Sequence, residues 1–336
     1  MAPMLIDTSS FALAMREKII RPTSKEILVA RLSGSDQEQD LTLPTNCEGL
    51  GRVRHFVRAT ASDWPQNPLP IDPASKALGL PGSDILLAQV FQNAACAWRC
   101  WYCYVPFNLL SGDASRGEWV TPERLVQLYA KVEDRPPVID LSGGSPDLTP
   151  EWIPWMMRAL ERANLSDETY LWSDDNLSTD YVFTKLQNDD RLTLASYRNY
   201  GRVCCIKGFD AASFAFNTTA DPSGYERQFE ILRRYMTLGI DVYGYVTLTG
   251  NDLSSVDSGV SNLVDRLYSI HEAFPLRVVP LKIGNYTPTA SRSKAGDERF
   301  ALAEAVQSAA IERWNFELSR RYSSAELALN IADVKL

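Results

Sequence analysis

Three cysteines that lie within eight residues give this sequence its strongest chemical signal. They stand in Cys96-Ala-Trp-Arg-Cys100-Trp-Tyr-Cys103 and make up half of the six cysteines of a chain with only two histidines. Each gap spans about one turn of backbone, so the three thiolates can approach one inorganic centre. Iron–sulfur clusters are held by such thiolates, and a four-iron cluster normally takes four. With three local ligands one iron would stay open to a small molecule, like the free position of a catalytic metal.

A structural zinc site and a disulfide framework are the alternatives for this cysteine group. Zinc usually takes four ligands, and no other Cys or His lies within forty residues of the triplet. Disulfide frameworks are typical of small secreted domains, whereas this chain has 336 residues. The sequence therefore favours an iron–sulfur cluster over both.

The composition restricts the class of partner and the compartment. The chain is 45% hydrophobic and 23% charged, with a net charge of −8, which argues against broad binding to nucleic acid. It contains no apolar run of the roughly 18 residues that a membrane span needs, and its first twenty residues lack the pattern of a secretory signal. Free cysteines and an oxygen-sensitive cluster would suit a reducing cytoplasm.

From Ile85 onward, predicted strands alternate with predicted helices, which is typical of parallel βα units. Two helix starts are marked by Thr121-Pro122-Glu123 and Thr149-Pro150-Glu151, in which a capping residue precedes a proline and an acid. The six predicted strands are 85–92, 138–141, 168–173, 202–207, 240–248 and 276–280, and the later helices start near 178 and cover 222–238, 258–273 and 297–322.

Residues 1–84 form a separate extension in this interpretation. Strands are predicted at 25–33 and 49–57, and residues 64–82, with five prolines and two glycines, are predicted to be an extended connection. The extension would cover the open side of a barrel, help to bind substrate, or serve as a purely structural apron.

Six βα units with their chemistry at the carboxyl ends of the strands predict an α/β fold, an open partial (β/α)6 TIM-like barrel, because parallel α/β folds bind their ligands at that edge. We expect three regions: the extension at 1–84, the barrel at 85–290, and a closing helix and tail at 291–336.

The spacing C-x3-C-x2-C, with Tyr102 directly before the last cysteine, resembles the radical S-adenosylmethionine (radical SAM) superfamily. The resemblance covers roughly residues 85–290 and implies the same partial barrel. It also implies a [4Fe–4S] cluster on Cys96, Cys100 and Cys103 whose open iron chelates S-adenosylmethionine. One electron, from a donor such as flavodoxin or ferredoxin, would cleave that cofactor to methionine and a 5′-deoxyadenosyl radical, which abstracts hydrogen from a substrate.

Further cofactor contacts are implied at the ends of the next strands. Gly143-Gly144-Ser145-Pro146 stands where the family has Gly-Gly-Glu-Pro, so a backbone contact to the methionine amino group is expected and the glutamate role is lost. Ser173 and Asp175 stand where polar side chains meet the cofactor, although the same residues equally fit a helix-capping loop. Tyr102 and Thr249 are implied as contacts to the adenine.

The strand at 202–207 carries two more candidates. Alternation puts Val203, Cys205 and Lys207 on one face and Cys204 and Ile206 on the other. Activating enzymes of glycyl-radical proteins, a branch of the superfamily, have Asp-Leu-Lys here, and the chain keeps the lysine but lacks the aspartate. Lys207 would favour the cofactor carboxylate. Cys205 is either a small buried apolar residue or the catalytic donor of a hydrogen atom to a substrate radical.

Three hypotheses of function follow. The first is a radical SAM enzyme that acts on a small organic or peptide substrate in a biosynthetic pathway. The second is an activase that installs a glycyl radical on a partner enzyme. The third is a non-catalytic iron–sulfur or zinc protein for sensing or scaffolding, which would not cleave S-adenosylmethionine.

Overall fold

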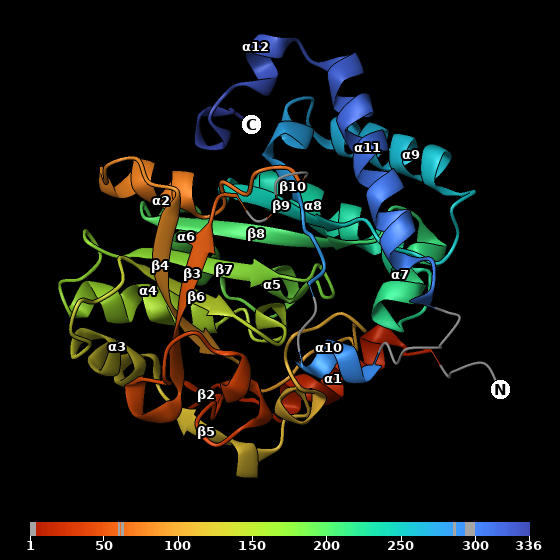
Figure 1. Ribbon diagram of the computed structural model, residues 1–336. Coiled ribbons are helices and arrows are strands. Elements are labelled where there is room, and N and C mark those ends of the chain that lie inside the picture. Colours follow the sequence, from red (N-terminus) through yellow and green to blue (C-terminus); the bar gives the residue numbers. More distant parts are fainter. Residues whose placement is uncertain (1–4, 60, 62–63, 285–286, 293–299) are drawn as a thin grey trace.

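One open, curled sheet of seven strands organises the chain in the computed structural model (Figure 1). The structure describes residues 5–59, 61, 64–284, 287–292 and 300–336. The order across the sheet is β10-β9-β8-β7-β6-β4-β3. Its strands are β3 (Gly51–Val57), β4 (Ile85–Gln92), β6 (Val138–Ser142), β7 (Tyr170–Asp175), β8 (Tyr200–Lys207), β9 (Val242–Thr247) and β10 (Val278–Pro280).

The six strands from β4 to β10 are parallel, and β3 pairs with β4 in the antiparallel direction. The fold is therefore mixed α/β with the six parallel strands that the sequence predicted. Because all six run the same way, their carboxyl ends meet at one edge, and the loops that leave this edge are the ones that can build a ligand site.

A second, three-stranded sheet lies beside the first. Its strands are β1 (Ile20–Arg21), β2 (Glu26–Ala30) and β5 (Gly117–Val120), and all its pairs are antiparallel. The backbone N–H of Ala94, just after β4, donates to the carbonyl of Leu28 in β2 at 3.0 Å. The N-terminal residues are thus bonded to the start of the cysteine loop.

The helices that follow the parallel strands cover the outer face of the large sheet (Figure 1). The longer helices of the chain are α1 (Thr8–Glu17), α3 (Pro122–Ala130), α4 (Trp152–Arg162), α6 (Asn188–Ser196), α8 (Gly224–Leu238), α9 (Val256–Ile270) and α11 (Ala303–Arg321). The shorter helices are α2 (Ile71–Leu78), α5 (Tyr181–Thr184), α7 (Ala211–Thr218), α10 (Thr287–Arg292) and α12 (Ser324–Leu327).

Strand alternation divides the buried residues between the two faces of the sheet. Ile139, Leu141 and Cys204 belong to the large outer core, which the helices complete. A separate core fills part of the concave, inner face, and α2 closes it with Ile71 and Ala74. The remaining members of this inner core are Phe56, Leu69, Leu86, Ala88, Val138, Tyr170, Trp172, Val203, Cys205, Tyr243, Tyr245, Val279 and Ile331.

Several local predictions are confirmed. β4 has the predicted bounds, Ile85–Gln92. The side chain of Thr121 caps α3 by accepting from the backbone N–H of Arg124 at 3.3 Å, with Pro122 in the first helical position. Gly239 ends α8 in the left-handed conformation. The sequence signals for the two helix ends each lie within a few neighbouring residues, which is the range over which capping acts.

The N-terminal extension differs from the prediction. Its strand β3 is hydrogen-bonded to β4 along its whole length, from Gly51 opposite Phe91 to Val57 opposite Ile85, so the segment is not separate from the sheet. Residues 64–82 include the helix α2 instead of an extended connection. Proline is tolerated there because Pro73 stands in the first turn, where its missing N–H would have no helical partner.

Two helix starts also fall later than predicted. α4 begins at Trp152, with no side-chain cap at Glu151. The backbone carbonyl of Thr149 accepts from the N–H of Trp152 at 3.0 Å, so a turn precedes the helix. The closing helix α11 begins at Ala303, and the predicted start at Asp297 lies outside the described residues.

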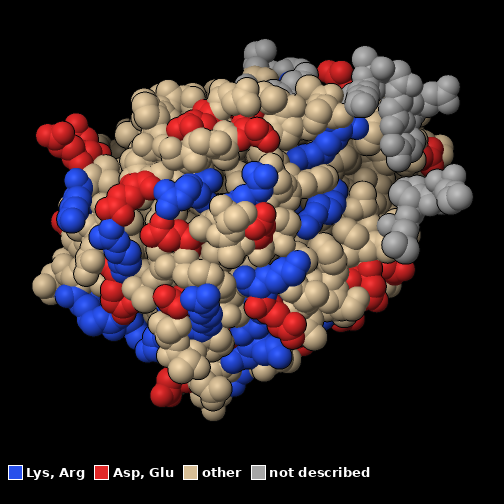
Figure 2. Space-filling model, turned by 90° about the horizontal axis from the view of Figure 1, so that it is seen from below, with Lys and Arg blue, Asp and Glu red and all other residues tan. Residues whose placement is uncertain are grey.

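Two observations bear on the expected partners. Among the described residues, no helix combines the length and the apolar character needed to cross a bilayer. On the face seen in Figure 2, basic and acidic side chains are interspersed. Nucleic-acid binding relies on clustered Lys and Arg, and this face does not offer such a cluster.

The inner core generates a test of the fold. Ile71 of α2 is buried, whereas Ile85 at the start of β4 is 52% exposed. We expect Ile71→Ala to lower the free energy of unfolding by about 2–5 kcal/mol, because it leaves a cavity in a packed core. Ile85→Ala removes the same atoms from the surface and should cost within about 1 kcal/mol. Urea denaturation measures both, and equal losses would show that α2 does not close the inner face.

Candidate functional site

The three motif cysteines lie on the loop that leaves the carboxyl end of β4. Cys96 and Cys100 are buried and Cys103 is half-buried. All six cysteines of the chain are free thiols, so the disulfide framework considered as an alternative is wrong. The arrow of β7 in Figure 1 points toward the side where α7 and α10 lie, and the cysteine loop is bonded to both helices, as described below. The motif therefore lies at the edge where parallel sheets bind their ligands.

The three thiols share one electrostatic environment. Burial raises the pKa of Cys100 to about 12, and Cys96 and Cys103 raise it further while Lys207 opposes the shift. Burial likewise raises the pKa of Cys103, with Cys96 as the next cause. Thiolates so placed need positive charge to be stable, which a bound metal supplies by deprotonating its thiol ligands.

The three thiols are not arranged as a ligand set. Within the described residues, no three His, Cys, Asp or Glu side chains are grouped around a metal position. Cys96 and Cys103 nevertheless act electrostatically on Cys100, so the three thiols lie near one another. The donor set, three thiols and no fourth ligand nearby in sequence, fits the iron–sulfur cluster predicted from the sequence.

Arg99, inside the motif, fixes the first part of the cysteine loop. Its Nη1 donates to the carbonyl oxygens of Cys96 at 3.0 Å and Trp98 at 2.8 Å, and its Nη2 donates to that of Leu110 at 3.1 Å. The guanidinium thus gives hydrogen-bond partners to backbone carbonyls that a helix or a sheet would otherwise satisfy.

Arg292, at the end of α10, fixes the second part. Its Nη1 donates to the carbonyl of Cys103, and its Nη2 donates to the carbonyl of Val105 at 2.8 Å. The guanidinium also lies over the ring of Phe107, 3.7 Å from the centroid. An arginine about 190 residues away in sequence thus holds the backbone at the third cysteine, a contact that sequence reasoning missed.

The two tryptophans of the motif attach the loop to neighbouring elements. Trp98 Nε1 donates to Thr8 Oγ1 of α1 at 3.1 Å, and Trp101 Nε1 donates to Asn217 Oδ1 of α7 at 3.3 Å. Asn217 in turn donates to the carbonyl of Thr249 at 2.9 Å. Thr249 is therefore linked to the motif through Asn217, while its own hydroxyl donates to the carbonyl of Ala303 at 3.0 Å.

The Gly143-Gly144-Ser145 turn lies directly against the start of the cysteine loop. Both glycines have positive φ, +70° and +66°, which glycine adopts without strain. A Cβ on Gly144 would lie 2.4 Å from the carbonyl oxygen of Ala95. The N–H of Ser145 donates to that carbonyl at 2.8 Å, and the Cys96 thiol lies 3.6 Å from Ser145 Oγ. The turn thus brings Ser145 to the first cysteine.

Asn176, after β7, joins these groups and was not selected from the sequence. Its Nδ2 donates to Ser145 Oγ at 2.8 Å and to the carbonyl of Gly144 at 3.2 Å, and it lies 3.9 Å from Cys96 Sγ. The signal was present, since Asn176 follows a predicted strand in a run of polar residues. Its partners come from two other strand ends, however, which no local pattern reveals.

Lys207 and Tyr102 meet on the inner side of the site. The ammonium of Lys207 lies 5.8 Å from the centroid of the Tyr102 ring, and Tyr102 OH donates to Thr247 Oγ1 at 3.2 Å. Burial alone would lower the pKa of Lys207, but Tyr102, Cys205 and Cys100 together hold it well above its usual value. A buried lysine side chain therefore lies near the thiols.

Cys205 and Cys204 divide as the alternation predicted. Cys205 belongs to the inner core and Cys204 to the outer one. Burial raises the pKa of Cys205 to about 12, although Lys207 opposes this. The thiol therefore keeps its hydrogen at neutral pH.

Ser173 and Asp175 lie on the outer face of the sheet, away from the thiols. Ser173 Oγ is 2.8 Å from Tyr200 OH. Asp175 accepts from Arg202 Nη1 at 3.0 Å and from Tyr235 OH of α8 at 2.8 Å. The strand alternation therefore does not bring these two side chains to the predicted cofactor contact. Asp174 between them is the residue of this strand end that faces inward, and Ser142 Oγ donates to it.

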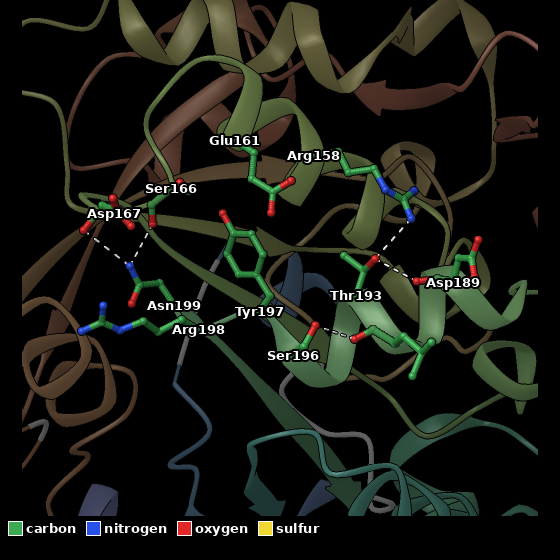
Figure 3. Close-up of a pocket in the computed structure, with 11 residues that line it drawn as sticks. Arg158, Glu161, Ser166, Asp167, Asp189, Thr193, Ser196, Tyr197, Arg198 and Asn199 are labelled. Carbon is green, nitrogen blue, oxygen red and sulfur yellow. Dashed lines mark hydrogen bonds between the residues drawn. The ribbon is translucent and has the colours of Figure 1, made fainter.

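A separate surface pocket of about 450 Å³ lies elsewhere (Figure 3). It is formed by α4, α6 and the segments that precede β7 and β8, and Arg158 donates to Thr193 across it at 3.2 Å. Because these segments enter the sheet at the amino ends of the strands, the pocket is at the opposite edge from the cysteines. Its lining contains none of the predicted site residues: it consists of Arg158, Glu161, Ser166, Asp167, Asp189, Leu192, Thr193, Ser196, Tyr197, Arg198 and Asn199.

Comparisons with known proteins give weak likenesses. No protein-family model and no curated protein matches the chain. Among solved structures it is similar to Streptococcus suis SuiB bound to S-adenosylmethionine, with 15% identity and a TM-score of 0.48 over 70% of this chain and 48% of that one. SuiB bound to the precursor peptide SuiA gives 16% identity and a TM-score of 0.38 over 54% and 36% of the two chains.

A third solved structure, anSMEcpe with bound AdoMet, gives 12% identity and a TM-score of 0.39 over 66% of this chain and 55% of that one. The match to SuiB spans about half of the SuiB chain. At such identities and TM-scores these likenesses assign neither a family nor an activity to the chain.

The Arg292 contact predicts a measurable loss of order. We expect Arg292→Gln to raise amide hydrogen exchange across residues 101–105 by about tenfold or more, since each hydrogen bond from a charged donor contributes about 1.5–3 kcal/mol. Mass spectrometry of peptides that span the motif measures the rates. Arg320→Gln, on the exposed side of α11, is the control. Unchanged exchange in Arg292→Gln would show that this arginine does not hold the loop.

Proposed function

We propose that this chain is a radical SAM enzyme that reductively cleaves S-adenosylmethionine and abstracts hydrogen from a small organic or peptide substrate. One observation carries the proposal. Three free thiols share one loop at the carboxyl edge of a parallel sheet, and Lys207 at the end of another parallel strand, β8, lies near them. This set offers three ligands and leaves a position open, which a purely structural metal site does not do.

The cysteines would hold a [4Fe–4S] cluster, and the neighbouring side chains fit that group. Asn176 and Ser145 reach Cys96 from two other strand ends, and hydrogen bonds to cluster sulfurs are a means of tuning the reduction potential. When bound, the cluster would supply the electron that splits S-adenosylmethionine to methionine and a 5′-deoxyadenosyl radical. A donor such as flavodoxin or ferredoxin would provide that electron.

The residues at the strand ends would bind and orient S-adenosylmethionine. Lys207 offers a buried ammonium for its carboxylate. The carbonyl of Gly144 accepts one hydrogen bond from Asn176 and retains a second lone pair for the methionine amino group. The ring of Tyr102 and the backbone at Thr249 would contact the adenine. Ser173 and Asp175 would act indirectly, by fixing the strand end through Tyr200, Arg202 and Tyr235.

Cys205 would serve as the hydrogen-atom donor to the substrate radical. It lies on the inner face next to Lys207, and its raised pKa keeps it as a neutral thiol, which is the form that has a hydrogen atom to give. Cys204 points to the outer core and has no such role.

Aromatic side chains would shield the site from water. Trp101 is in ring contact with Phe216 and with Phe300, at centroid distances of 5.9 and 5.0 Å. Exclusion of water strengthens the electrostatic interactions inside a site and protects reactive intermediates. A reducing compartment such as the cytoplasm would keep the free thiols available for cluster assembly.

The test is cleavage of S-adenosylmethionine. The protein is reconstituted anaerobically with iron and sulfide and reduced with dithionite, and 5′-deoxyadenosine is then quantified. We expect formation by the wild type, loss to background in Cys100→Ala, and retention in Cys204→Ala, which removes a buried thiol on the outer face. An intact four-iron cluster that yields no 5′-deoxyadenosine would contradict the proposal and favour a role in sensing or scaffolding.

A further inference from the structure

Two arginines of β3 project into the concave face of the sheet, beneath the cysteine loop. Arg52 and Arg54 are two residues apart and so share a face; Arg54 Nη1 lies 3.5 Å from Asp140 Oδ2 of β6. Arg52 Nη2 donates at 2.8 Å to the hydroxyl of Tyr104, the residue directly after Cys103. We call Arg52 and Arg54 the interior arginine pair.

The acceptors around this pair do not use all of its donors. Within the described residues, Arg52 Nε is buried without a hydrogen-bond partner, and so is Gln92 Nε2 on the inner end of β4. Among the same residues the long contact to Asp140 is the one ion pair of Arg54. The side chain of Arg54 is 31% exposed, whereas that of Asp140 is fully buried behind it. A buried donor without an acceptor is costly and calls for an explanation.

Two carboxylates lie near the pair. Burial raises the pKa of Asp140 to about 7, and the neighbouring Asp174 raises it further. Asp174 accepts from Ser142, and burial raises its pKa as well. Within the described residues, Asp140 Oδ1 is a buried acceptor without a partner, just as Arg52 Nε and Gln92 Nε2 are buried donors without one. The two guanidinium groups, of which that of Arg54 is partly exposed, favour an anionic ligand over a cationic one.

We propose that the substrate of this chain carries a carboxylate, which the interior arginine pair binds on the concave face below the cysteine loop. A guanidinium presents two parallel N–H groups that match the two oxygens of a carboxylate. That the ligand is the substrate rests on the proposed function. The inference also gives the N-terminal extension a role in substrate binding.

The position also suits the chemistry. Arg52 contacts the residue next to the third cysteine, and Cys205 and Lys207 lie on the same inner face, where Asp174 and Lys207 interact with Cys205. A carboxylate held by Arg54 would orient the rest of a small substrate toward the cysteine loop. Binding energy at a remote group of this kind is what positions a reacting bond.

The experiment measures binding of matched probes to the full chain, reconstituted anaerobically with iron and sulfide and saturated with S-adenosylmethionine. The probes are N-acetyl amino acids, each paired with its own amide, which has nearly the same shape and no charge. Ligand-observed NMR gives the affinities. We expect at least one acid to bind about tenfold or more tightly than its amide, because the charge-assisted bidentate contact is lost in the amide.

Variants assign the effect to the pair. Arg54→Gln should weaken binding of that acid by about tenfold or more, and Arg54→Lys should weaken it less because the charge remains. Arg54→Gln/Asp140→Asn keeps a neutral, hydrogen-bonded pair and serves if the single variant does not fold. Arg31→Gln, an exposed arginine of the same segment that pairs with Glu118, should bind like the wild type.

Three results would overturn the inference: binding of no acid, equal binding of an acid and its amide, or unchanged affinity in both Arg54 variants that remove the charge. Formation of 5′-deoxyadenosine in the same samples separates this inference from the proposed function. Cleavage without carboxylate selectivity refutes the carboxylate alone. Selectivity without cleavage retains the binding site and refutes the radical chemistry.

Discussion

The proposed function depends on one constraint: three thiols of a loop with little regular structure have to face one position. Helices and strands satisfy their own backbone groups, but an irregular buried loop needs partners from elsewhere. Here two arginines supply them: Arg99 binds two carbonyls within the motif and one after it, and Arg292 binds the carbonyls of Cys103 and Val105. The surrounding sheet and helices bring these partners to the loop.

Strand alternation decides which side chains reach the site. The inward face of a strand could be predicted where one of its residues was already expected to point inward. Lys207 identified the inner face of β8, so Cys205 and Cys204 could be assigned correctly. At the end of β7, Ser173, Asp174 and Asp175 are all polar, and the sequence does not say which of them face inward. On the outer face Ser173 pairs with Tyr200 of β8, and Asp175 accepts from Arg202 of β8 and Tyr235 of α8. Those partners become neighbours only after the chain has folded.

The N-terminal extension also depends on partners that are distant in the sequence, which a local pattern does not reveal. A strand at 49–57 was predicted from its own residues, but the pairing of β3 with β4 depends on partners further along the chain, from Ile85 opposite Val57 to Phe91 opposite Gly51. The helix α2 was missed because prolines dominate its surroundings, although one proline in a first turn is compatible with a helix. The extension lines the concave face with Arg52 and Arg54 and closes it with Ile71. The sequence had left three alternative roles open for this region and singled out none of these residues.

The most direct test of the central claim is Mössbauer spectroscopy of the protein reconstituted with isotopically enriched iron, recorded with and without S-adenosylmethionine. Three cysteine ligands predict a four-iron cluster in which one iron differs from the other three, and the signal of that iron should change when S-adenosylmethionine is added. Four irons that S-adenosylmethionine leaves unchanged, or failure to assemble a four-iron cluster at all, would contradict the account.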